Sequence, residues 1–153
     1  MKALEHRLPP PLLMLATGAI MSVALLDQGA PALSAAWRWG LASLFFVAAG
    51  LVGFPAFSAF GKAKTTINPV DIGQASSLVT TGIYGLTRNP MYVALALLLC
   101  GWAAWIARPL PLLGPVVFFL FITRFQIIPE ERALAAKFGA AYADYCRNVR
   151  RWL

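Results

Sequence analysis

The chain has 153 residues, of which 59% are hydrophobic and only 12% are charged, and its net charge is +7. Soluble domains carry roughly 25% charged residues, so this composition excludes an ordinary soluble domain and favours a single membrane domain. The positive charge does not indicate nucleic acid as a partner, because long apolar blocks separate the Lys and Arg residues. Anionic lipid headgroups of a bilayer suit such a charge better.

Two apolar blocks occupy the first half of the chain. The first, residues 12–26, follows a short basic start. A signal peptide is the alternative interpretation, because residues 30–32 (Ala-Pro-Ala) resemble a cleavage site, but we interpret the block as a first membrane helix. The second, residues 40–60, has about the ~20 residues that a helix needs to cross the hydrocarbon core. Gly50 and Gly53 in this block permit a close helix contact.

A long polar stretch, residues 61–89, precedes two further apolar blocks, residues 90–107 and 112–128. The short connection at Arg108 and Pro109 predicts that these two blocks form an antiparallel hairpin. The sequence therefore predicts an all-α integral membrane protein with about four transmembrane helices and a loop that joins the second helix to the third.

The last segment, residues 129–153, has a different character. Glu130 and Glu131 suit the first turn of a helix, where the backbone dipole favours negative charge. Apolar residues at Leu134, Phe138 and Tyr142 recur at a four-residue spacing. We predict a C-terminal amphipathic helix that lies at the membrane surface or against the bundle.

The distribution of basic residues predicts the orientation. Of the 13 Lys and Arg residues, two lie in the N-terminal segment and three lie in the 61–89 loop. Six more lie in the C-terminal part from Arg124 onward. Only Arg38 and Arg108 would lie on the other side of the membrane. The positive-inside rule therefore places both termini and the 61–89 loop in the cytoplasm.

Residues 78–92, Leu-Val-Thr-Thr-Gly-Ile-Tyr-Gly-Leu-Thr-Arg-Asn-Pro-Met-Tyr, form a turn-rich segment that leads into the third block. Because blocks three and four form a hairpin, this segment and Glu130-Glu131 converge at its cytoplasmic end. Each residue also has a purely structural interpretation, such as Arg88 as a positive-inside anchor, but their convergence favours a site. The sequence offers no metal-ligand set, since its one histidine, His6, has no partners.

In this order, segments 78–84, 88–92 and 130–151 resemble the superfamily of isoprenylcysteine carboxyl methyltransferases and phospholipid methyltransferases. The resemblance covers roughly residue 65 to the C-terminus. It implies an integral membrane enzyme that uses S-adenosylmethionine (SAM), bound at the cytoplasmic end of the hairpin. The two helices before the motif fit a minimal prokaryotic member of the inner (plasma) membrane.

The resemblance also implies roles for individual residues. Two are catalytic candidates: Arg88, which would meet the carboxylate of SAM, and Glu131, a candidate general base. The implied substrate-binding residues are Arg124, Gln126 and Arg151. The implied cofactor-binding residues are Ser76, Leu78, Val79, Tyr84, Asn89, Pro90, Met91, Tyr92 and Glu130.

The sequence departs from the family pattern at three positions. Asn89 replaces a common His, and Ala94 replaces a frequent Gly. Gln126 stands where prenylcysteine enzymes place an Arg for the substrate carboxylate, so we expect a different acceptor, an apolar or amphipathic molecule that enters from the bilayer. Two alternatives stay open: a non-enzymatic membrane protein that kept the fold, and a membrane reductase related to sterol reductases.

Overall fold

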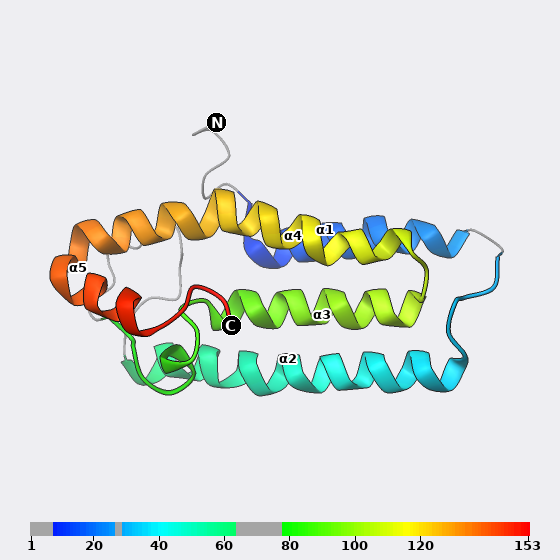
Figure 1. Cartoon of the computed structure of the whole chain (residues 1–153), viewed down its shortest axis with the longest axis horizontal. Helices are drawn as coiled ribbons and strands as arrows, with labels where there is room; N and C mark the ends of the chain where they lie inside the picture. Colours follow the sequence, from blue (N-terminus) through cyan, green and yellow to red (C-terminus); the bar gives the residue numbers. More distant parts are fainter. Residues whose placement is uncertain (1–7, 27–28, 64–77) are drawn as a thin grey trace.

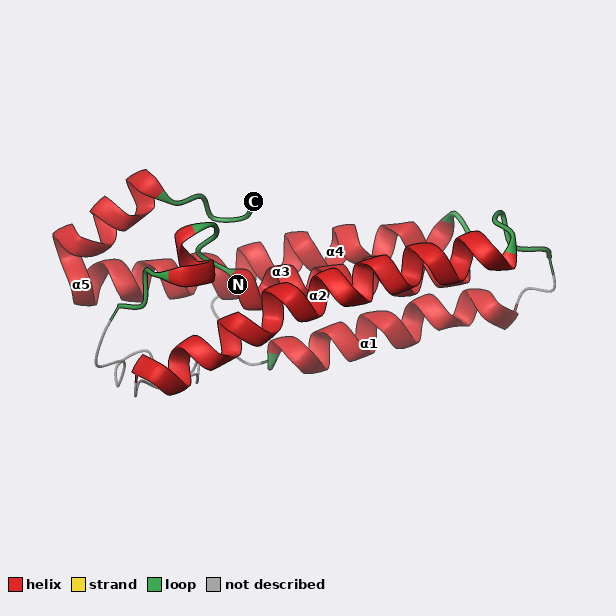
Figure 2. Ribbon diagram, turned by 90° about the horizontal axis from the view of Figure 1, so that it is seen from below, coloured by secondary structure: helices red, strands yellow, loops and turns green. Residues whose placement is uncertain are grey.

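The computed structural model describes residues 8–26, 29–63 and 78–153. Within these ranges every regular element is a helix, in agreement with the predicted all-α class. Figures 1 and 2 show helices α1 to α4 lying along the longest axis of the molecule. They are α1 (Pro10–Ser22), α2 (Ala35–Ala63), α3 (Pro90–Ile106) and α4 (Leu113–Ile122).

The helix bounds lie close to the predicted apolar blocks, although α2 begins at Ala35 rather than at residue 40. Five shorter or C-terminal elements complete the described part: η2 (Val23–Leu26), η4 (Gly82–Gly85), η5 (Leu110–Leu112), the π-helix η6 (Thr123–Ile127) and α5 (Ile128–Asn148). Because α4, η6 and α5 follow one another without a break, the predicted fourth block continues directly into the C-terminal helix.

Helix α3 is central and packs against α1, α2 and α4. Its inward residues Leu99 and Ile106 are almost fully buried with Phe118 and Ile122 of α4. The outward faces of the bundle are also apolar: Phe54 of α2 and several neighbouring large side chains are strongly exposed. A surface of this kind is unfavourable in water and suits the hydrocarbon core of a bilayer.

Small residues allow α2 and α3 to approach closely. A Cβ atom placed on Gly53 would lie 3.1 Å from the Cβ atom of Ala94, and one placed on Gly101 would lie 2.9 Å from the ring of Phe46. Gly50, by contrast, faces open space. Of the two glycines singled out in the sequence, only Gly53 therefore contributes to the close helix contact.

The end of the bundle formed by the C-terminus of α3 holds Arg38 and Arg108. Arg38 donates from Nε to the carbonyl oxygen of Trp105 at 2.6 Å, and its guanidinium lies over the Trp105 ring. Arg108 donates to the carbonyl oxygen of Gly29. These two arginines therefore lie at the opposite end of α3 from Arg88.

Residues 129–153 differ from the single helix that was predicted for them. Helix α5 ends at Asn148, and it is interrupted at Gly139, where φ is 51° and ψ is −122°. Figure 1 shows the chain leaving α4 in one direction and turning back within α5 toward the loop before α3. The apolar residues Leu134 and Phe138 pack against Tyr142 and Tyr145 beyond the break. A glycine adopts this backbone conformation without the steric cost that a Cβ atom would impose.

We predict that Gly139→Ala destabilises the protein by about 1–3 kcal/mol, because alanine at this φ and ψ is strained. The thermal unfolding midpoint in detergent would measure the effect. Gly50→Ala is the matched control: it makes the same chemical change in a helix with open space around it, and should leave stability unchanged or slightly higher. Equal midpoints for the two variants would contradict the role given to Gly139.

Candidate functional site

The loop before α3 and the start of α5 come together because α3 and α4 are antiparallel. Gly82, at φ 64°, opens the short helix η4, which places Tyr84 in the interior. The Tyr145 hydroxyl donates to the carbonyl oxygen of Tyr84 at 2.7 Å and so fastens the loop to the second half of α5. Asn89 then occupies the position before Pro90, the first residue of α3.

Three side chains from α3, η6 and α5 form what we name the Glu130 cluster: Tyr92, Gln126 and Glu130. The Tyr92 hydroxyl donates to Glu130 Oε1 at 2.6 Å, and Gln126 Nε2 donates to the same oxygen at 2.7 Å. Gln126 is only 4% exposed and lies on the π-helix η6, which directly follows α4. Both of these hydrogen bonds go to Oε1, and none from the described residues goes to Oε2.

Glu130 follows the apolar stretch 112–128 and lies in the first turn of the charged helix α5. Burial raises the pKa of this carboxyl to about 7, although the hydrogen bonds from Tyr92 and Gln126 act in the opposite direction. Near neutral pH the site thus contains a carboxyl group that can be present in either protonation state.

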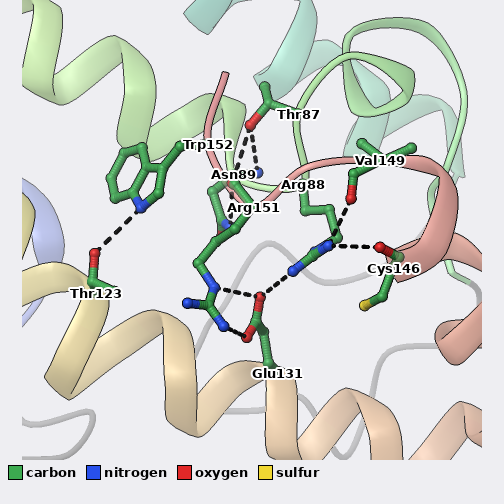
Figure 3. A network of polar contacts seen from close by, with 9 residues as sticks. All are labelled: Thr87, Arg88, Asn89, Thr123, Glu131, Cys146, Val149, Arg151 and Trp152. Atoms are coloured by element: carbon green, nitrogen blue, oxygen red, sulfur yellow. Dashed lines mark hydrogen bonds and ion pairs between the residues drawn. The ribbon is translucent and has the colours of Figure 1, made fainter.

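A second group, the arginine–glutamate network, consists of Arg88, Glu131 and Arg151 (Figure 3). Arg88 Nη2 lies 2.8 Å from Glu131 Oε1, and Arg151 donates to Oε1 from Nε at 3.0 Å and to Oε2 from Nη2 at 2.6 Å. Burial alone would raise the pKa of Glu131, but the hydrogen bonds from Arg151 and Arg88 outweigh it and lower the pKa. Both oxygens of this carboxylate are therefore committed to arginines.

The loop before α3 also binds the backbone of the chain end. Arg88 donates from its backbone nitrogen to the Arg150 carbonyl oxygen at 2.9 Å, and from Nη1 to the Val149 carbonyl oxygen at 2.6 Å. Asn89 Nδ2 donates to the Arg151 carbonyl oxygen at 2.9 Å, and the Thr87 hydroxyl donates to it at 3.2 Å. Figure 3 shows these side chains pointing toward the residues that follow α5.

The structure thus divides the predicted site residues into two neighbouring groups. Tyr92, Gln126 and Glu130 meet in one group, and Arg88, Glu131 and Arg151 meet in the other, with Asn89 beside the second. Leu78 packs against the Tyr142–Tyr145 cluster. Val79 and Met91 are partly buried, and Pro90 is buried at the start of α3.

Arg124 and Ser76 belong to neither group. Arg124 is exposed, and its guanidinium lies over the ring of Phe125 at 5.5 Å. Arg124 and Gln126 lie two residues apart on the same helical turn, so one side chain points outward and the other points inward. Ser76 lies outside the described residues.

Two residues that shape the site have no signal in the sequence. Thr87 is completely buried, and its hydroxyl also accepts a hydrogen bond from the backbone nitrogen of Asn89 at 3.2 Å. Trp152 donates from Nε1 to Thr123 Oγ1 at 3.3 Å. A Thr in a turn and a Trp near a chain end are both ordinary, and only the tertiary contacts distinguish them.

Comparison with known proteins defines the class. The phospholipid methyltransferase family model matches residues 37–141, and the chain belongs to this family. This match confirms the superfamily that the motif series resembles. Helices Ala35–Ala59 and Leu110–Asn148 are long and apolar enough to cross a membrane, while Pro10–Leu26 and Pro90–Ile106 are shorter apolar helices. Together with the family, these helices make it a membrane protein.

Two relatives show how far the similarity extends. An uncharacterized protein of Haemophilus influenzae is 46% identical over 63 residues, which are 41% of this chain and all of that protein. Protein-S-isoprenylcysteine O-methyltransferase A of Arabidopsis thaliana is 28% identical over 120 residues, 74% of this chain and 57% of the plant enzyme. The match thus spans little more than half of that enzyme. No solved structure matches the chain.

The raised pKa of Glu130 predicts a pH-dependent cost to stability. The folded protein keeps this proton up to about pH 7, whereas the unfolded chain loses it near 4.5, so stability falls as the pH rises between these values. Relative to wild type, Glu130→Gln should gain about 2 kcal/mol in free energy of unfolding between about pH 5 and about pH 8. Denaturant unfolding in detergent would measure this difference.

Glu131→Gln is the matched control. The pKa of Glu131 is lowered below 4.5, so its carboxylate stays ionised in both states across the same interval. The stability difference between Glu131→Gln and wild type should therefore not change over that interval. A pH-independent difference for Glu130→Gln would contradict the raised pKa.

Proposed function

We propose that this protein is an integral membrane methyltransferase that uses SAM and methylates an apolar or amphipathic acceptor at the cytoplasmic face. The observation that carries the proposal is the Glu130 cluster at the open end of the α3–α4 hairpin, inside the family-matched region. The family, and the similarity to an O-methyltransferase of Arabidopsis, support methyl transfer as the reaction class.

The chemistry of the site suits SAM. When bound, SAM supplies a methyl group activated by its sulfonium. Its ammonium and ribose hydroxyl groups are hydrogen-bond donors, and Glu130 Oε2 is a carboxylate oxygen whose partner oxygen is already held by Tyr92 and Gln126. Arg88 Nε is buried and makes no hydrogen bond within the described part of the chain, which leaves a donor for an anionic group.

Methyl transfer requires alignment of acceptor and donor more than covalent help from the protein. Tyr92 and Gln126, only 9% and 4% exposed, provide a rigid and water-poor floor for this alignment. Glu131 does not suit the role of general base, because two arginines occupy its oxygens and lower its pKa. We therefore assign Glu131 the role of holding Arg88 and Arg151 in place.

We further propose that α1, α2, α3 and α4 all cross the membrane, with both chain ends and the loop before α3 in the cytoplasm. The apolar outer surface and the placement of Arg38 and Arg108 at the far end of α3 support this topology. The 17-residue helix α3 is at the lower limit for a crossing.

Isothermal titration calorimetry with purified protein tests the cofactor. Wild type should bind SAM or S-adenosylhomocysteine, and Glu130→Ala and Tyr92→Ala should each weaken binding by about tenfold or more, because a charged hydrogen bond is lost. Arg147→Ala, which removes an exposed arginine paired with Asp144, should retain the affinity. No binding by wild type at millimolar ligand would refute the cofactor, and unchanged affinity in both site variants would refute the site.

A thermal-shift comparison of SAM with NADPH separates the alternatives. The proposed methyltransferase shifts with SAM alone, a reductase shifts with NADPH, and a non-enzymatic protein of this fold shifts with neither.

Cysteine labelling tests the topology. In a background without Cys100 and Cys146, a cysteine at the exposed position Leu153 should react with an impermeant maleimide in inside-out vesicles only. A cysteine at the exposed position Leu33 should react in right-side-out vesicles only. Labelling of both positions from the same side would contradict an odd number of crossings between them.

A further inference from the structure

The last five residues, 149–153, which we name the C-terminal segment, contact both halves of the site. On one side lies the loop before α3. The Arg151 side chain holds Glu131, and the Arg151 carbonyl oxygen accepts hydrogen bonds from Thr87 and Asn89. Since Asn89 directly precedes α3, these contacts lie at the start of the helix that carries Tyr92.

On the other side lies the junction between α4 and the π-helix η6. The Trp152 ring packs on Phe119 with centroids 4.5 Å apart, and its Nε1 donates to Thr123 Oγ1. The Thr123 hydroxyl in turn donates to the Phe119 carbonyl oxygen at 2.7 Å. Thr123 is the first residue of the π-helix that carries Gln126. Trp152 thus contacts the helical turn from which Gln126 reaches Glu130.

We propose that Arg151 and Trp152 are positioning residues: the C-terminal segment holds the loop before α3 and the π-helix in the relative placement that the cofactor site requires. This inference rests on the proposed function and changes the role of Arg151, which the family resemblance implied to bind substrate. Arg151 is 40% exposed at its side chain, but Glu131, which it binds, is only 17% exposed, and Arg88, which binds the same carboxylate, is only 11% exposed.

Arg151 differs from the nearby Arg147 in the carboxylate that it binds. Arg147, four residues earlier and within α5, is 71% exposed and, among the described residues, pairs with Asp144 of its own helix. Arg151 instead reaches Glu131 of a segment 20 residues away along the chain. Two arginines of the same type, four residues apart, therefore differ in whether they join distant parts of the fold.

Affinity for S-adenosylhomocysteine, measured by calorimetry well below each variant's unfolding midpoint, tests the inference. Arg151→Ala and Trp152→Ala should each weaken binding by about tenfold, while Arg147→Ala and Leu153→Ala stay within about twofold of wild type. Arg151→Lys should recover part of the affinity, since it keeps the charge but not the two-nitrogen contact with Glu131. Trp152→Phe should fall between wild type and Trp152→Ala, because it keeps the ring and loses the donor.

The outcomes separate this inference from the proposed function. Wild-type affinity in Arg151→Ala and Trp152→Ala, with lowered unfolding midpoints, would mean that the C-terminal segment only stabilises the fold and would overturn the inference. If Glu130→Ala still loses affinity in that case, the cofactor site itself stands. If wild type binds no S-adenosylhomocysteine, the proposed function fails and the inference fails with it.

Discussion

The site depends on the shared carboxylate of Glu131. It joins Arg88, from the loop before α3, to Arg151, from the C-terminal segment, and it does so from the first turn of α5. The pair with Arg88 is largely screened from solvent and contributes about 1–3 kcal/mol, whereas the pair with the more exposed Arg151 contributes less. Removing the carboxylate would leave two arginines facing each other, so the three groups act as one unit.

That unit can form only because the chain reverses direction. A straight helix from residue 128 to residue 153 would carry Arg151 far from Glu131, since each residue advances a helix by about 1.5 Å. The break at Gly139 returns the second half of α5 to the loop before α3. Leu134 and Phe138 then pack against Tyr142 and Tyr145, which buries the apolar face of α5 inside the protein.

Much of the helical framework could be predicted because each apolar block has the length and uniform hydropathy of a helix in an apolar environment. The convergence of Tyr92 with Glu130 could also be predicted, since an antiparallel hairpin brings the start of one helix beside the end of the next. The roles of Arg88 and Glu131 could not be predicted. Both oxygens of Glu131 accept hydrogen bonds from arginines that lie 43 and 20 residues away along the chain, and only the fold brings these together. Thr87 and Trp152 were missed for the same reason.

By itself, the sequence determined the all-helical class of the protein and the family to which it belongs. These properties follow from composition, from hydropathy blocks and from short motifs, all of which are local. Only the tertiary structure decided which polar side chains meet. It separated Glu130, whose Oε1 accepts hydrogen bonds from Tyr92 and Gln126, from the adjacent Glu131, whose oxygens both bind arginines. Neighbouring residues on a helix point in different directions, so two glutamates that read alike in sequence reach different partners.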